Sequence, residues 1–145
     1  MPPTGGSDGA TGHVYMTYTF VIPGKPVAKG RPKFAKPGIK AIVYTPDKTR
    51  QWGKDAKMII KAAMKGKPLL DGAVKADFEL YMPKPKRLKR KYPTTKPDAT
   101  NTIKAAEDAM NGIVFIDDAQ ITRITAFKEY SDDPRVVIHV SAIED

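Results

Sequence analysis

The chain has 145 residues, of which 41% are hydrophobic and 28% are charged, so it fits one domain with a core and is too apolar for general disorder. It has no cysteine and two histidines, which excludes disulfides and cysteine zinc sites and leaves oxygen as the donor for any metal. Its formal net charge of +9 makes nucleic acid the leading partner, because neutralising phosphates releases counterions.

Residues 1–14 predict a flexible tail, followed by one domain over residues 15–145. The tail lacks the basic start and apolar run of a secretion signal, and no stretch approaches the roughly 20 apolar residues that cross a bilayer. Residues 15–22 are aromatic and β-branched, which predicts a first strand. Prolines and glycines in residues 23–40 predict an exposed loop, whose basic residues Lys25, Lys29, Arg31 and Lys33 are candidates for DNA binding.

A short strand is expected at residues 41–44, and a helix at residues 47–65, before the stop signals Gly66 and Pro68. The apolar residues with helical spacing are Trp52, Ala56, Ile59, Ile60 and Ala63. A basic stripe on the other side of this helix consists of Arg50, Lys54, Lys57, Lys61 and Lys65. Most such stripes are solvated faces, so the stripe alone is weak evidence for a binding surface.

Residues 74–82 alternate between apolar and polar side chains, which predicts a half-buried strand. Prolines keep residues 83–97 from forming a continuous helix, so this segment should be an exposed basic loop. Its candidates for contact with DNA are Lys86, Arg87, Lys89, Arg90 and Lys96.

A second helix is expected at residues 101–111, with Gly112 as its C-terminal stop. Residues 113–116 are either a short strand or a buried connection. Two final strands, at residues 120–130 and 135–143, predict a hairpin around a turn at 131–134. The order of elements predicts a single α/β (α+β) domain with two helices packed on a mixed sheet.

The second predicted helix has a polar side and an apolar side. At about 100° per residue, one side carries Asn101, Lys104 and Asp108. The roughly opposite side carries Ile103, Ala106 and Met110, which should pack against the sheet.

Carboxylates flank this helix although the chain is strongly basic. Asp98 precedes it, and Asp117 with Asp118 follows an apolar run that returns the chain to the helix. Carboxylates beside a lysine, here Lys104, are typical of magnesium-dependent nucleases, because hard divalent cations prefer oxygen donors and such a metal activates water. The pattern favours a nuclease, with a non-enzymatic nucleic-acid-binding module and a basic protein-interaction adaptor as alternatives.

Each acidic residue also has a purely structural interpretation. Asp98 is well placed to begin a helix, where the helix dipole favours a negative charge. Asp117 and Asp118 suit a turn between strands, and Lys104 with Asp108 suits a surface ion pair.

The segment KPDATNTIKAAEDAMNGIVFIDDAQI, residues 96–121, resembles the signature of the RusA family of Holliday-junction resolvases, found in bacteria and their prophages. Segments 24–32 and 45–49 also resemble that family, so the resemblance covers most of residues 18–140. The matching residues of the signature are Lys96, Pro97, Asp98, Asn101, Lys104, Asp108, Ala109, Gly112, Asp117, Asp118 and Gln120.

The resemblance implies a cytoplasmic, homodimeric endonuclease of a bacterium or prophage, active in recombination and repair. It implies that Mg²⁺, or Mn²⁺ in its place, supports paired symmetric cuts in a four-way DNA junction. The catalytic residues it implies are Asp98, Lys104 and Asp118. We expect metal binding by Asp98, Asp118 and Asp117, with supporting roles for Thr100, Asn101 and Asp108.

One position departs from the family pattern. The family's second aspartate falls on Thr100, whose neutral hydroxyl is a poor magnesium ligand, so one charge is missing from the implied site. Asp117, Asp108 or Glu107 is a candidate to compensate. The alternative is a protein that binds junctions without cutting them.

Overall fold

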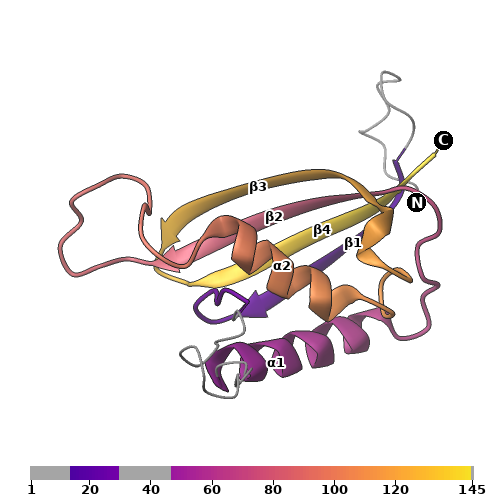
Figure 1. Ribbon diagram of the computed structural model, residues 1–145, viewed down its shortest axis with the longest axis horizontal. Coiled ribbons are helices and arrows are strands. Elements are labelled where there is room, and N and C mark those ends of the chain that lie inside the picture. The colour runs from indigo at the N-terminus through magenta and orange to yellow at the C-terminus, as the bar shows by residue number, and fades with distance from the viewer. Residues whose placement is uncertain (1–13, 30–46, 145) are drawn as a thin grey trace, which may run out of the picture.

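The computed structural model describes residues 14–29 and 47–144, in which two helices cover one face of a four-stranded mixed sheet (Figure 1). This confirms the predicted α+β class. The predicted short strand at 41–44, Arg31, Lys33 and the tail before Val14 lie outside the described residues. The elements are β1 (Val14–Pro23), α1 (Asp47–Met64), β2 (Val74–Pro83), α2 (Ala99–Met110), the 3-10 turn η1 (Asp118–Gln120), β3 (Ile121–Ser131) and β4 (Arg135–Ile143).

The sheet has the strand order β1-β4-β2-β3, and the predicted hairpin between the last two strands is wrong. β4 pairs antiparallel with both β1 and β2, whereas β3 pairs in parallel with β2. The connection between β3 and β4 therefore passes the end of β2, a step of about 10 Å that its few residues can span. Alternating polarity predicts which side chains are buried, but it does not identify the neighbouring strand.

The core lies between the sheet and the helices. All five apolar residues of the β2 alternation are buried, as predicted, including Phe78 and Leu80. α1 buries Trp52, Ala56, Ile60 and Met64. The predicted core residue Ala63 is instead exposed, because Met64 is the residue four positions after Ile60 and occupies the inner face.

The helix α2 begins at Ala99, two residues before its predicted start, and Gly112 follows it with a φ of 77°. Its predicted apolar side is confirmed, since Ala106 and Met110 are fully buried and Ile103 is partly buried against the core. The buried surface is wider than predicted and also includes Thr102, Ala105 and Ala109, because α2 contacts both the sheet and α1. The next residues, including Val114 and Phe115, form a buried connection rather than a strand of the sheet.

The face of the sheet turned away from the helices carries balanced charge. Strand register places three basic and three acidic residues on it: Lys75, Arg123 and Arg135 with Asp77, Glu79 and Glu129. A hydrogen bond of 2.6 Å joins Glu79 to His139, and Arg135 stacks over the ring of Tyr81. The positive charge of the chain is therefore concentrated elsewhere. No helix within the described residues is long and apolar enough to span a membrane.

Candidate active site

Asp98 stands at the N-cap of α2, and its main chain and its side chain have separate roles. The main-chain oxygen accepts hydrogen bonds from the amide and the hydroxyl of Thr102, both at 3.0 Å. The carboxylate makes no capping hydrogen bond. It accepts hydrogen bonds from the Lys96 ammonium at 3.0 and 3.1 Å and from the side-chain amide of Asn101 at 3.3 Å. Helix capping therefore does not explain the presence of this side chain.

Lys128 of β3 holds the chain immediately before Asp98. Its ammonium donates hydrogen bonds to the carbonyl oxygens of Thr95, at 2.9 Å, and Pro97, at 3.1 Å. No local pattern in the sequence points to Lys128, because its partners lie 31 and 33 residues away. It is a positioning residue, since it fixes the main chain that carries Asp98.

Lys104, on the polar side of α2, contacts Asp118 at the start of η1. The ammonium lies 3.3 Å from the Asp118 carboxylate and 3.8 Å from that of Glu107. The hydrogen bond to Asp118 and the charge of this carboxylate raise the pKa of Lys104, so the ammonium stays protonated at neutral pH. The ion pair between Lys104 and Asp108 that the structural interpretation predicts does not form. Asp108 instead pairs with Lys29 at 2.8 Å.

Glu107, which the sequence suggested only as a candidate to compensate for Thr100, lies beside Lys104. Its side chain is only 12% exposed, and this burial raises its pKa. The nearby carboxylates of Asp118 and Asp108 raise the pKa further, while the Lys104 ammonium opposes the shift. Glu107, Asp108 and Asp118 therefore form one electrostatic group around Lys104.

The turn η1 is fixed by Asp117 and Gln120. The Asp117 carboxylate accepts a hydrogen bond from the Ala119 amide at 2.9 Å, so it caps the turn. The Gln120 side chain accepts from the amides of Ile116 and Asp117 and donates to the carbonyl oxygens of Leu70 and Gly72. These bonds lock the turn to the chain that enters β2 and position Asp118. The role of Asp117 as a metal ligand stays a prediction.

The other candidate residues are Thr100, two lysines paired with acidic residues, and a set of exposed basic residues. Thr100 is exposed in the first turn of α2, close in sequence to Asp98. Lys29 and Lys96, predicted to bind DNA, each pair with an acidic residue of this region. The remaining described candidates are exposed, and most lie on the segment between β2 and α2 that extends beyond the sheet (Figure 1): Lys25, Lys86, Arg87, Lys89 and Arg90.

The carboxylates of the candidate site have the donor chemistry that suits Mg²⁺. Asp98 and Asp118 offer carboxylate oxygens, the donors that this ion prefers. Within residues 14–29 and 47–144, no three acidic or histidine side chains are grouped so as to hold a metal. Such a group is not required, since Mg²⁺ keeps several waters and commonly binds through one or two carboxylates together with substrate phosphates.

One family profile and one known protein match this chain. The profile of the Endodeoxyribonuclease RusA family matches residues 23–141, which include α1, β2, α2, η1, β3 and most of β4, but only the last residue of β1. The Bacillus subtilis (strain 168) protein YqaN is 30% identical over 136 residues, an alignment that covers 86% of this chain and 95% of YqaN.

Proposed function

The chain belongs to the RusA family of endodeoxyribonucleases, which acts on Holliday-junction DNA, and from this membership we propose that it is a cytoplasmic endonuclease that resolves four-way junctions. The products would be two nicked duplexes, made by paired symmetric cuts during recombination and repair. The observation that carries the proposal is the contact of Lys104 with Asp118. It joins two residues of the family signature, 14 positions apart, at an exposed surface of a basic protein.

We assign metal binding to Asp98 and Asp118, with Asp117 beside Asp118. Bound Mg²⁺, or Mn²⁺ in its place, would activate water and stabilise the charge that develops on the leaving oxygen. The Asn101 side-chain amide and the Lys96 ammonium both donate hydrogen bonds to the Asp98 carboxylate. That support suits a ligand, because fixed partners in the surroundings keep a metal-binding side chain in one orientation.

Lys104 is assigned to the phosphate that is cut. It is protonated at neutral pH, as lysine ordinarily is, and it lies 3.3 Å from the Asp118 carboxylate. A protonated ammonium at this place can donate hydrogen bonds to a non-bridging phosphate oxygen and stabilise the negative charge of the transition state. Asp118 holds the ammonium in position until DNA arrives.

The exposed basic residues would bind the junction arms through phosphates, which position DNA without reading its sequence. A two-fold symmetric dimer would supply two equivalent active sites for the two cuts.

A synthetic four-way junction tests the proposal directly. We expect cleavage into two nicked duplexes with Mg²⁺ and none with EDTA, as resolved on a denaturing gel. Symmetric cuts in opposite strands are expected, and light scattering should give the mass of a dimer. If an unbranched duplex is cut at the same rate, junction resolution is contradicted.

A protein that binds junctions without cutting them is the alternative, and Thr100 is the observation that favours it. The family pattern has a carboxylate there, and this chain has an exposed neutral hydroxyl. Junction binding with no cleavage in either Mg²⁺ or Mn²⁺ would establish this alternative.

Binding to the junction should weaken steeply with salt, and the segment between β2 and α2 should supply part of this dependence. All four residues, Lys86, Arg87, Lys89 and Arg90, are replaced by glutamine in one variant. The slope of log affinity against log salt concentration should become less steep by about 0.9 for each phosphate that is no longer neutralised. Gel shifts at several salt concentrations measure this slope. The control replaces Lys75 and Arg123, on the charge-balanced face, and should leave it nearly unchanged. An equal effect per removed charge in both variants would argue against a specific role for the segment.

A further inference from the structure

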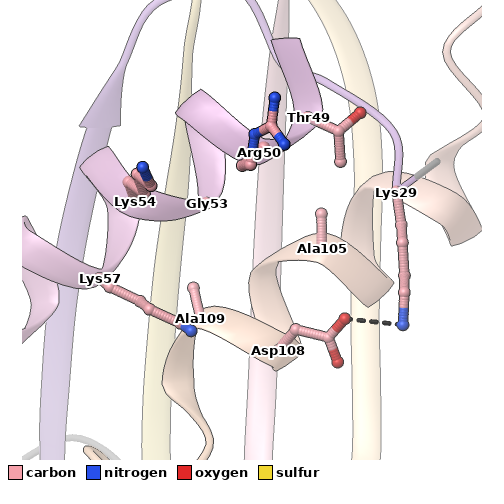
Figure 2. A pocket seen from close by; sticks show the side chains of 9 residues that line it. All are labelled: Lys29, Thr49, Arg50, Gly53, Lys54, Lys57, Ala105, Asp108 and Ala109. Carbon is pink, nitrogen blue, oxygen red and sulfur yellow. Dashed lines mark ion pairs between the residues drawn. The ribbon is translucent and has the colours of Figure 1, made fainter. Parts of the chain in front are cut away.

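A cavity of about 380 Å³ lies between α1 and α2 (Figure 2). Four of its lining side chains are basic, and one is acidic, so its net charge is about +3. Figure 2 shows Lys57 extending from α1 toward Ala109 of α2, with the ion pair of Lys29 and Asp108 at another side of the opening. The basic side chains are Lys29, Arg50, Lys54 and Lys57.

Gly53 lines this cavity, although nothing in the protein's own fold requires a glycine there. It lies in the interior of α1, where glycine is less favourable than alanine because it loses more conformational freedom on folding. Its φ is not positive, so a side chain would not strain the backbone. A Cβ atom at this position would meet nothing within 4 Å. Neither packing nor backbone conformation therefore accounts for a glycine here, and the position lines the cavity without a side chain.

Charge and position connect the cavity to the candidate active site. Asp108 lines the cavity and lies one turn of α2 after Lys104, on the same side of the helix. The main chain at Lys29 is bonded to α2, since its amide donates a hydrogen bond to the Asn101 carbonyl oxygen at 3.0 Å. Thr49 of α1 donates to the carbonyl oxygen of Ala28 at 2.9 Å, which ties the same segment to α1.

We infer that this cavity binds a phosphate group of the DNA backbone, with its sugar against Gly53, on the strand that passes Lys104. The inference rests on the proposed function and adds a specific subsite to it. Lys54 and Lys57 form no ion pair within the described part of the chain, so their charges are available to a phosphate. The apolar part of the lining consists of small residues, Gly53, Ala105 and Ala109, so the sugar and phosphate can come close to the main chain of both helices.

Gly53→Ala and Gly53→Gln separate binding from stability. Both should raise the melting temperature, Gly53→Ala by about 3 °C, because both residues form helices better than glycine. Gly53→Gln also fills the cavity, so its affinity for a synthetic four-way junction in EDTA should fall about tenfold. Met58→Gln, at an exposed position of α1 outside the cavity, is the steric control and should bind normally.

The charge of the cavity is tested by two double variants, one within α1 and one at its C-terminal end. Lys54→Ala with Lys57→Ala should reduce the salt slope of junction binding by about 1 for each phosphate that the cavity no longer neutralises. Lys61→Ala with Lys65→Ala removes the same charge outside the cavity and should have the smaller effect.

The outcomes distinguish the subsite from the proposed function. If the unaltered protein does not bind the junction, the proposed function itself fails. If it binds, but Gly53→Gln binds equally well or the two lysine pairs have equal effects, the function stands and the phosphate subsite is wrong.

Discussion

Asp98→Asn and Asp118→Asn should each reduce the rate of junction cleavage by about 100-fold or more, because losing even an outer partner of a metal ligand commonly costs 10- to 100-fold. Each change removes one negative charge and one proposed metal ligand. DNA is a polyanion and loses only a repulsion, so its affinity should stay the same or rise slightly. Cleavage and gel-shift assays on the same preparations measure the two effects.

Folding should survive both substitutions. The Asp98 carboxylate makes no capping hydrogen bond, and the main-chain oxygen that bonds to Thr102 is retained in asparagine. Asp118 contributes a partly exposed ion pair with Lys104, which is worth about 1 kcal/mol at most. Thermal melting should therefore change little. Asp55→Asn, an exposed acid of α1 bonded to Gln51, is the matched control and should cleave normally. Cleavage at the unaltered rate by either site variant would remove that residue from the metal site.

The local part of the site could be predicted from the sequence because its signals are periodic. A repeat of 3.6 residues places Lys104 and Asp108 on the polar side of α2, and Gly112 marks the end of the helix through a φ that glycine adopts readily. Ala106 and Met110 are buried for the same reason. These predictions depend on residues less than four turns apart.

The contacts that assemble the site depend on partners far away in the sequence. Gln120 bonds to carbonyl oxygens 48 and 50 residues before it, and Lys128 bonds to the chain more than 30 residues before it. A main-chain carbonyl is present at every residue, so side-chain identity cannot reveal which one is bonded. The same limit explains the wrong hairpin: a short turn after β3 predicted a neighbouring strand, but β2 occupies that place.

The sequence predicted correctly that Asp108 lies on the polar side of α2, but it predicted the wrong ion-pair partner, Lys104 instead of Lys29. Lys104 and Asp108 do share one side of α2, yet each finds a partner from another segment. Asp108 pairs with Lys29, and Lys104 pairs with Asp118. A surface ion pair between residues four apart on a helix contributes only about 0.5 kcal/mol, so these contacts with other segments replace it. The chain thus brings a basic segment and η1 to the same helix.

Thr100→Asp should increase metal-dependent cleavage about tenfold and lower the Mg²⁺ concentration needed for half the maximal rate. The substitution restores a carboxylate where the family pattern has one, two residues after Asp98. Because Thr100 is exposed, the new side chain meets no steric barrier. The first turn of α2 has no acidic residue, so a negative charge there should also stabilise the helix by about 0.5 kcal/mol.

Thr100→Asn separates the ligand charge from side-chain size, since asparagine has nearly the same shape as aspartate but no charge. Only the aspartate variant should gain cleavage and Mg²⁺ affinity, and calorimetry with Mg²⁺ alone measures the affinity without DNA. A rise in melting temperature without either gain would mean that the charge acts on the helix dipole only. In that case the site has been rebuilt around other acids, of which Glu107 is the nearest to Lys104 after Asp118, and the assignment of Thr100 to the metal site is wrong.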